Sequence, residues 1–296
     1  MAQKKLVWQS KLVLLLVLPF ASASVVLQAH SFAVSLAQAA IWTLGLSLIL
    51  GLMVAQLRAA TPGGAFAGAV ITACLMFSTA SLPYRPWRTA LAPVMAVFVL
   101  TWLGTRLGQE QKERLGTAER RQGRTAAQVA ANLGVAALVS SDLTQSWLID
   151  SGWFSRAVQA PTLLLSVGLA ALAEAAADTV SSEIGQVWGG QPRMITTLRS
   201  VEPGTDGAVS LIGTLAGLIA AGIVSSVGAL ALSGGAAMFW ISFAGGLFGL
   251  FFDSLQGATL ERCGWLNNDA VNFLSTASAA AFALGLLALL PHFGIQ

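Results

Sequence analysis

Two carboxylates, Glu174 and Asp178, stand four residues apart in the stretch AEAAADTVSSEIG, and their spacing suits metal binding. A helix would carry both on one face, one turn apart. Glu183 lies nine residues after Glu174, about half a turn out of phase. It joins the pair only if the helix breaks, and we expect a break near Ser181. This spacing is typical of metal ligands and predicts a magnesium site that holds nucleotide phosphates.

A structural interpretation competes with this one. Burying ionised carboxylates at the edge of a bilayer costs several kcal/mol unless a cation or a partner compensates. Glu174 would then hydrogen-bond across helices, and Asp178 would mark the exit of its helix into water.

The elements that position these residues are membrane helices. The chain is 55% hydrophobic and 10% charged over 296 residues, with a mean hydropathy of +0.73, which excludes an ordinary soluble domain. Apolar runs of about 17 to 25 residues suit helices that cross about 30 Å of hydrocarbon. We therefore expect an all-α fold, a polytopic integral membrane helical bundle forming one transmembrane domain. About nine spans are predicted, at residues 12–29, 36–57, 64–82, 89–105, 125–141, 161–177, 207–231, 236–252 and 270–290.

The first apolar run leaves two interpretations open. Its basic start and the letters LVLLLVLPFASA resemble a cleaved signal peptide. The apolar run continues past this point, which favours a first span that is retained.

Basic residues set the orientation. With the amino terminus in the cytoplasm, all of the 16 lysines and arginines except Arg85, Arg88 and Arg156 fall on the cytoplasmic side. The polar loops 106–124, 178–206 and 253–269 then share the face that meets cytoplasmic nucleotides. We expect a multi-pass protein of the cytoplasmic (inner) membrane with its site facing the cytoplasm.

The loop 106–124 ends in RRQGR, shortly before Gln128 and Asn132. One interpretation is a positive-inside loop that lies beside anionic headgroups. The other is phosphate capture by Arg120, Arg121 and Arg124, with the two amides on one face of the next helix.

In the loop 178–206, prolines and glycines forbid a continuous helix, so backbone amides could point at an anion. Thr205 or Asp206 would cap the next span, whose amino end favours phosphate. The alternative is an ordinary Gly-Pro turn. The following GTLAG is more typical of a packing seam of small residues.

The loop 253–269 repeats the pattern, because a span ends at Asp253 and Asn268 opens the last span. Asn268 would cap that helix in the simplest interpretation. Asn272 lies one turn further on, and with Asp253 it would complete a metal or ribose site.

Several chemistries are excluded by the sequence. His30 and His292 fall near the outer ends of spans, so no histidine serves the polar face, and no GxxxxGK[ST] motif occurs. Any nucleotide must be held by magnesium, arginine and backbone. The basic cluster has interleaved acids and few aromatics, which gives no signal for nucleic acid.

The motifs AAADTVSSEIG, PRMITTLRSVEPGTDGAVSLIGTLAG, DSLQGATLE and NNDAVNFLSTA follow one another in this order. Together they resemble the membrane family known as domain of unknown function 92, or transmembrane protein 19-like, whose plant members are similar to phytyl-phosphate kinases. More distantly, Asp178, Gly185, Gly189 and the turn from Gly204 to Gly207 resemble CTP-dependent dolichol and phytol kinases and phosphatidate cytidylyltransferases. Those relatives carry a lysine before the turn. Val201 and Glu202 stand there in this chain, so an arginine would have to replace the charge.

The residues and the resemblance together imply a CTP-dependent kinase that converts an isoprenyl (phytyl or geranylgeranyl) monophosphate into its diphosphate in the membrane. The predicted catalytic residues are Asp178, Glu183 and Asp253, and the predicted Mg²⁺ ligands are Glu174, Asp178, Glu183 and Asp253. The predicted nucleotide-binding residues are Arg193, Thr196, Arg199, Gly204, Thr205, Asp206, Gly207, Arg124, Asn132, Asn268 and Asn272.

Two alternatives stay open at this point. A membrane cytidylyltransferase would use the same metal and CTP but release pyrophosphate and form a CDP-lipid. A transporter would use the intramembrane carboxylates as a pathway, but the outer halves of the spans carry few polar groups, which favours an enzyme.

Overall fold

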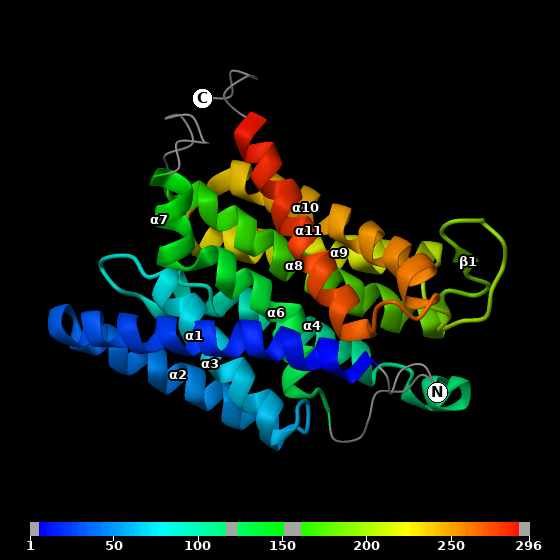
Figure 1. Ribbon diagram of the computed structural model, residues 1–296, viewed down its shortest axis with the longest axis horizontal. Coiled ribbons are helices and arrows are strands. Elements are labelled where there is room, and N and C mark those ends of the chain that lie inside the picture. The colour runs from blue at the N-terminus through cyan, green and yellow to red at the C-terminus, as the bar shows by residue number, and fades with distance from the viewer. Residues whose placement is uncertain (1–5, 117–122, 151–160, 290–296) are drawn as a thin grey trace.

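The computed structural model describes residues 6–116, 123–150 and 161–289, and these form a bundle of helices (Figure 1). The helices are α1 Val7–Ser35, α2 Ala37–Gln56, α3 Pro62–Ser78, α4 Leu91–Arg106, α5 Gln109–Leu115, α6 Ala126–Ser140, α7 Asp142–Asp150, α8 Pro161–Trp188, α9 Leu211–Ala231, α10 Gly235–Gln256 and α11 Asn268–Leu289. The shorter elements are the 3-10 turn η2 Pro86–Arg88, the π-helical turn η4 Gly257–Glu261, and the strands β1 Arg193–Met194 and β2 Ala208–Val209, which pair antiparallel.

The all-α membrane fold predicted from composition is confirmed, and each of the predicted spans coincides with one helix: α1, α2, α3, α4, α6, α8, α9, α10 and α11. Among the described residues, six of these helices are long and apolar enough to cross a membrane alone. Two bent pairs qualify when each pair is counted as one span, α4 with α5, bent by 65°, and α6 with α7, bent by 49°. Nine spans and a cytoplasmic amino terminus stay predictions.

Two helices continue beyond their predicted ends. α8 runs without interruption to Trp188, so the expected break near Ser181 is wrong. No proline interrupts it, and Gly185 is kept within the helix by close packing against Gly213 of α9. α10 continues to Gln256 and into η4, so Asp253 lies inside helical structure and does not end a span.

The start of α9 also differs from the prediction. The helix begins at Leu211, and the Ser210 hydroxyl accepts a hydrogen bond from the amide of Gly213 at 3.1 Å. Thr205 and Asp206 were expected to cap this helix, but they lie in the preceding loop. Ser210 takes the role because it directly precedes the helix, where a side-chain oxygen can reach the first free amides.

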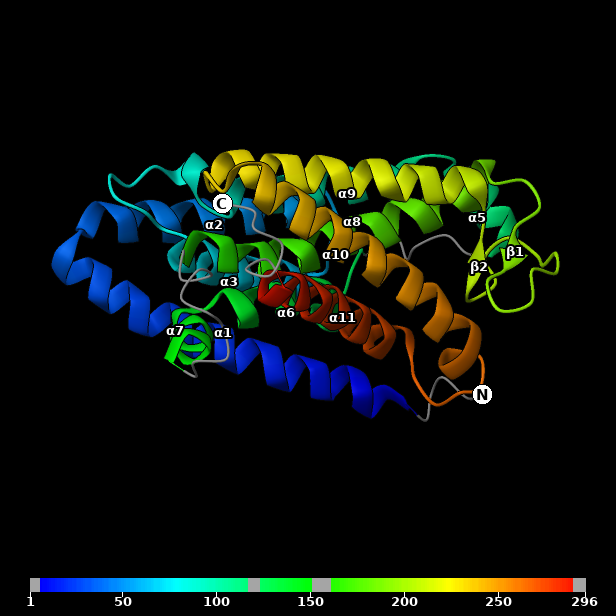
Figure 2. The ribbon, with the colours of Figure 1, turned by 90° about the horizontal axis from the view of Figure 1, so that it is seen from above.

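α8 is the central helix of the bundle. It contacts α4, α6, α9, α10 and α11, and its alanines from Ala173 to Ala177 are buried (Figures 1 and 2). Small side chains let the neighbouring backbones approach closely. A Cβ on Gly217 of α9 would lie 3.0 Å from the Ala177 carbonyl oxygen, so the GTLAG segment is the predicted packing seam.

Helices α1, α2 and α3 form one side of the bundle, and α9, α10 and α11 form the other (Figure 1). Large apolar side chains on the outer faces remain exposed, as expected for surfaces that meet lipid. Examples are Leu15, Val26, Ile41, Leu48, Ile219 and Leu230.

Candidate active site at the charged end of the bundle

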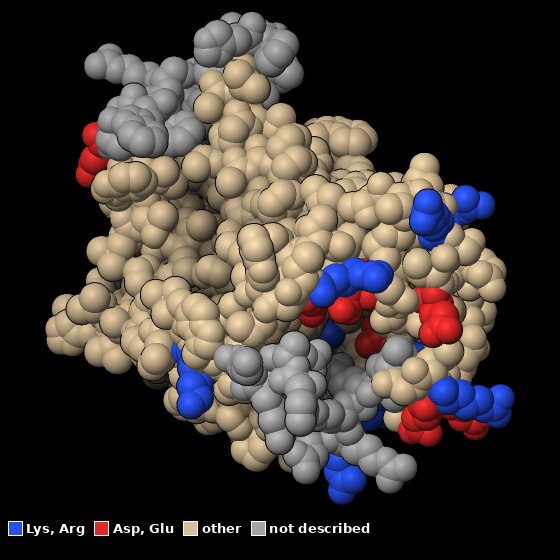
Figure 3. All heavy atoms as spheres, turned by 45° about the vertical axis from the view of Figure 1, so that its right-hand side comes forward, with Lys and Arg blue, Asp and Glu red and all other residues tan. Residues whose placement is uncertain are grey.

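The described parts of the three polar loops lie at one end of the bundle, which we name the charged end. Here α1, α3, α6, α9 and α11 begin, and α2, α4, α8 and α10 end. Hydrogen bonds tie these segments together: Gln9 donates to the Trp265 carbonyl at 2.8 Å, Arg106 to the Leu57 carbonyl at 3.0 Å, and Gln111 to the Val187 carbonyl at 3.0 Å. Figure 3 shows acidic and basic side chains gathered around a hollow in this end.

Three carboxyl groups cluster beneath the charged end, where Glu174 is buried and Asp178 and Asp253 are half-buried. Glu174 is 1% exposed, and its carboxylate interacts electrostatically with that of Asp178 one turn along α8. The Asp253 carboxyl group, from α10, interacts electrostatically with Asp178 and with Glu174. Ser275 of α11 lies beside Glu174 and Asp253. Three helices therefore build this carboxylate cluster, defined as Glu174, Asp178 and Asp253.

Gly249 of α10 makes room for Glu174. A Cβ at this glycine would lie 2.5 Å from Glu174 Cγ and 2.8 Å from Ala279 Cβ. A larger residue would push the carboxyl group out of its place between α8, α10 and α11. The approach of α10 to α8 therefore depends on a residue without a side chain.

Two oxygens of the cluster have no hydrogen-bond partner among the described residues. They are Glu174 Oε1 and Asp253 Oδ1, and both are buried. An unsatisfied buried polar atom costs about 1–3 kcal/mol, and more if it is charged. A hydrogen bond from Glu174 across the helices, as in the structural interpretation, would explain only part of this cluster. The two partnerless oxygens would still need a proton or a cation.

Arg124 supplies positive charge next to the cluster. Its Nη2 donates to Thr179 Oγ1 at 3.3 Å, and its guanidinium interacts electrostatically with Asp178. The backbone of Arg124 forms a bridge with Ala60 of the α2–α3 turn, and its carbonyl accepts from the Thr61 amide at 3.0 Å. Arg120 and Arg121, which were predicted to act with it, lie outside the described residues.

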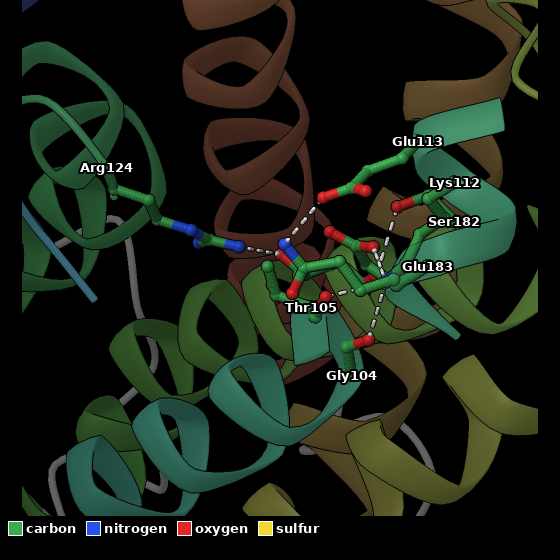
Figure 4. Close-up of polar contacts among 9 residues, drawn as sticks. Gly104, Thr105, Lys112, Glu113, Arg124, Ser182 and Glu183 are labelled. Atoms are coloured by element: carbon green, nitrogen blue, oxygen red, sulfur yellow. Dashed lines mark hydrogen bonds and ion pairs between the residues drawn. The ribbon is translucent and has the colours of Figure 1, made fainter. Parts of the chain in front are cut away.

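Glu183 does not join the carboxylate cluster. Its Oε2 receives a hydrogen bond from Lys112 Nζ at 2.6 Å, in an ion pair whose side chains are 14% and 1% exposed (Figure 4). Lys112 also donates to the carbonyls of Gly104 and Thr105 at the end of α4, at 3.0 and 2.7 Å. Because α8 stays helical, Glu183 is turned towards α4 and α5. Glu183 therefore forms an ion pair beside the cluster, and its carboxylate still interacts electrostatically with Asp178. Its predicted roles as metal ligand and catalyst stay predictions.

A second hollow of about 390 Å³ lies at the charged end, lined by Leu6, Gly204, Thr205, Asp206, Glu261, Arg262, Gly264, Leu266 and Asn267. Partial desolvation raises the pKa of Asp206, and the Arg262 guanidinium partly offsets this. Glu261 interacts electrostatically with Asp206 and with Asp178, so it connects this hollow to the carboxylate cluster. Gly207 has φ +75°, and a side chain there would clash with the backbone of Ala258, so this loop closes tightly onto η4.

The other predicted residues of the loop 178–206 are not brought to the cluster. Arg193 is exposed and donates to the Leu198 carbonyl of its own loop at 3.1 Å; Thr196 and Arg199 are exposed as well. Many backbone amides of this loop are used inside it, for example Ile195 to Gly207 at 3.1 Å. These bonded amides are not available to an anion, and the expectation for the other amides of the loop stays a prediction.

The predicted amide groups serve mostly local structure. Gln128 forms a capping box with Thr125 at the start of α6, and Asn132 Nδ2 donates to the Gln128 carbonyl at 2.8 Å. Asn267, not Asn268, caps α11, through a bond from the Ala270 amide at 2.9 Å. Asn268 is exposed.

Asn272 is half-buried one turn above the start of α11, and its carbonyl accepts from the Ser275 hydroxyl at 3.0 Å. Its predicted place in a metal or ribose site stays a prediction.

The model of the family described as "Integral membrane protein DUF92" matches residues 45–280. The chain belongs to this family. An uncharacterized membrane protein of Synechocystis is 35% identical over 68% of this chain and 74% of its own length. An uncharacterized membrane protein of Methanocaldococcus jannaschii is 44% identical over 36% of this chain and 45% of its own length. The chloroplastic protein VTE6 of Arabidopsis thaliana is 30% identical over 70% of this chain and 62% of its length. No solved structure matches the chain.

In this DUF92 protein, the carboxylate cluster fits a magnesium ion only together with a substrate. Among the described residues, no group of three or more histidine, cysteine, aspartate and glutamate side chains is placed to hold a metal ion. Mg²⁺ is normally bound by one or two carboxylates with substrate phosphates and water, not by a cage of protein ligands. The oxygens of Glu174 and Asp253 that lack a partner suit such a ligand set.

Three residues of the site were not predicted. Glu261 follows Asp253 by eight residues, about a fifth of a turn beyond two full helical turns, so the spacing alone did not place the two on one face. Ser275 and Lys112 carried no signal. Their positions depend on α11 packing against α8 and on α5 folding back onto the end of α4.

Proposed function

We propose that this protein is a membrane kinase that transfers the γ-phosphoryl group of CTP to an isoprenyl monophosphate, such as phytyl or geranylgeranyl phosphate. The observation that carries the proposal is the buried carboxylate cluster with Arg124 beside it, at the charged end of a membrane bundle. Membership of the DUF92 family supports it, because the plant members of that family resemble phytyl-phosphate kinases.

The transfer needs little covalent chemistry from the protein. The second pKa of a phosphate monoester is about 6, so the acceptor oxygen is largely ionised at neutral pH and needs no strong base. That oxygen attacks the γ-phosphorus, the bond from the γ-phosphorus to the bridging oxygen breaks, and CDP leaves with the electron pair. The products are the isoprenyl diphosphate and CDP.

The residues of the chain position the reactants and balance their charge. The carboxylates of the cluster would hold Mg²⁺ together with substrate phosphates, and the ion would supply positive charge to the donor phosphates. Arg124 would offset the charge on the acceptor phosphate. The partial burial of the cluster would limit the access of water to the reacting groups. Glu183 takes no part in this arrangement, because Lys112 binds it.

The test uses purified protein in nanodiscs with phytyl or geranylgeranyl monophosphate, Mg²⁺ and each nucleoside triphosphate in turn, with lipid and nucleotide products read by mass spectrometry. Isoprenyl diphosphate with CDP is expected. A lipid joined to CMP, with pyrophosphate released, would replace the kinase with a cytidylyltransferase. Absence of any product with every nucleotide would refute a phosphotransferase.

Asp178→Asn is the variant that ties the activity to the cluster, and Asp150→Asn in α7, at the opposite end, is its matched control. We expect Asp178→Asn to lose turnover while it elutes as a folded protein in size-exclusion chromatography, and Asp150→Asn to retain it. Full turnover in Asp178→Asn would remove the cluster from the chemistry.

A further inference from the structure

A cavity of about 720 Å³ lies between α2, α3, α4 and α6, apart from the carboxylate cluster. Its inner wall is apolar and includes Leu50, Val54, Val97, Phe98 and Leu133. The volume falls within the range of about 300–1,000 Å³ that is usual for small-molecule sites. The cavity is therefore large enough to hold a ligand, and its wall suits a hydrocarbon.

The cavity is elongated along α4. The lining residues of this helix run from Val94 to Arg106 and share one face. Twelve residues at a rise of 1.5 Å span about 18 Å, which takes the cavity from the charged end deep into the apolar bundle. This shape suits a single extended chain.

The mouth of the cavity at the charged end is basic. Three arginines line it, Arg58 from the end of α2, Arg106 from the end of α4 and Arg124 from the start of α6, together with one carboxylate, Glu113 of α5. Arg106 lies 4.4 Å from the ring centre of Trp102, another lining residue, which orients its guanidinium. Among the described residues, no carboxylate lies within ion-pair distance of Arg58 or Arg106. An anionic group at the mouth would balance these charges.

The cavity and the carboxylate cluster meet at two residues. Arg124 lines the cavity and also interacts with Asp178, and Ala175, which follows Glu174 on α8, lines the cavity wall. A headgroup held at the mouth would therefore lie beside the cluster.

We propose that this cavity binds a lipid phosphate with one apolar tail, the tail lying along α4 and the phosphate held by Arg58, Arg106 and Arg124. That this lipid is the phosphoryl acceptor rests on the function proposed above. The binding site itself does not, because the apolar wall and the basic mouth define the ligand without reference to turnover.

Gly68→Leu tests the tail site. Gly68 of α3 lines the cavity, and a Cβ there would make only an ordinary contact, 3.8 Å from Val129 Cγ1. The rest of the leucine side chain would occupy the cavity. Gly45→Leu in α2 is the matched control, since a Cβ at Gly45 has no heavy atom within 4 Å and the residue does not line the cavity.

The measurement is binding of geranylgeranyl monophosphate to the full chain in nanodiscs, by native mass spectrometry without nucleotide. We expect Gly68→Leu to weaken binding at least tenfold and Gly45→Leu to leave it unchanged. We expect Arg106→Gln to weaken binding of the monophosphate but not of geranylgeraniol, which lacks the phosphate. Inorganic phosphate should compete poorly, because it lacks a tail.

Equal binding in Gly68→Leu and the wild type would overturn the proposal. Equally effective competition by phosphatidic acid, which has two tails, would also overturn it. Binding that depends on Gly68 without turnover of any lipid phosphate would support the cavity while refuting the kinase. Turnover that is unchanged in Gly68→Leu would support the kinase while placing the tail elsewhere.

Discussion

The buried ion pair between Lys112 and Glu183 gives a prediction whose magnitude follows from the structure. All three donors of the Lys112 ammonium have acceptors, at 2.6 Å on Glu183 and at 3.0 and 2.7 Å on the carbonyls of Gly104 and Thr105. This pair holds α5 against the end of α4 and against α8. The side chains are 1% and 14% exposed, so water cannot replace the lost contacts freely.

Lys112→Met would leave the Glu183 carboxylate and two carbonyls without their donor. Breaking a buried pair from one side costs about 3–5 kcal/mol, because the remaining charge is left uncompensated. Glu183→Gln removes the opposite charge and is expected to destabilise as well. The double variant should lose less than the sum of the two single variants, by about 1 kcal/mol or more, because each single change already removes the shared interaction.

The assay is unfolding of the purified protein in mixed micelles of increasing SDS content, followed by circular dichroism. Arg114→Met, an exposed cation on the same short helix, is the control and should change stability by less than about 0.5 kcal/mol. If Lys112→Met unfolds at the same SDS content as Arg114→Met, the ion pair does not stabilise the fold. If the losses of stability in the two single variants simply add, the two side chains are not coupled and the ion pair is not the cause of the destabilisation.

Three further predictions concern the charged end. Arg193→Gln should leave the KM for nucleotide within about threefold of the wild type, since Arg193 bonds only within its loop. Arg124→Gln should raise the KM for the lipid acceptor about tenfold or more. A steady-state titration of each substrate compares the two variants, and the opposite order would contradict the site. Gly207→Ala should destabilise the protein by at least about 1–2 kcal/mol in the SDS titration. The reasons are the φ of +75° at this residue and the clash of the new methyl group with the backbone of Ala258. Wild-type stability in this variant would contradict the prediction. Desolvation raises the pKa of Asp206 in the folded state. The contribution of this group to stability is therefore full at pH values below its unfolded-state pKa. It is lost as the pH rises through the folded-state pKa. Asp206→Asn should therefore gain stability over the wild type as the pH rises to neutral and show no such gain in acid; the reverse trend would contradict the assignment.

The fold could be predicted from the sequence because a membrane helix is specified by local properties. An apolar run of sufficient length must form a helix in lipid, where every backbone group has to be satisfied within the segment. Glu174 and Asp178 share a face of α8 for the same local reason, their spacing of four residues. The seam from Gly213 to Gly217 was also visible, since small residues at this spacing let helices approach.

The boundaries were less predictable because polar residues do not end a helix by themselves. Glu183 and Ser181 suggested a loop, but α8 continues through both to Trp188. The Glu183 side chain finds its partner on a neighbouring helix, 71 residues away in the sequence. Lys112, predicted as part of a polar loop, is one of the most buried side chains of the described chain.

The class of fold, the helical segments and the gathering of polar loops at one end follow from local properties of the sequence, because hydropathy and the i, i+4 period act over one element at a time. Which polar groups meet depends on how the helices pack. Gly249 admits Glu174 between three helices, Asp253 of α10 interacts with Asp178 of α8, and Lys112 of α5 pairs with Glu183. The cavity along α4 is likewise a property of four helices together. Such contacts depend on the rotation and approach of whole helices, which no single segment of the sequence specifies.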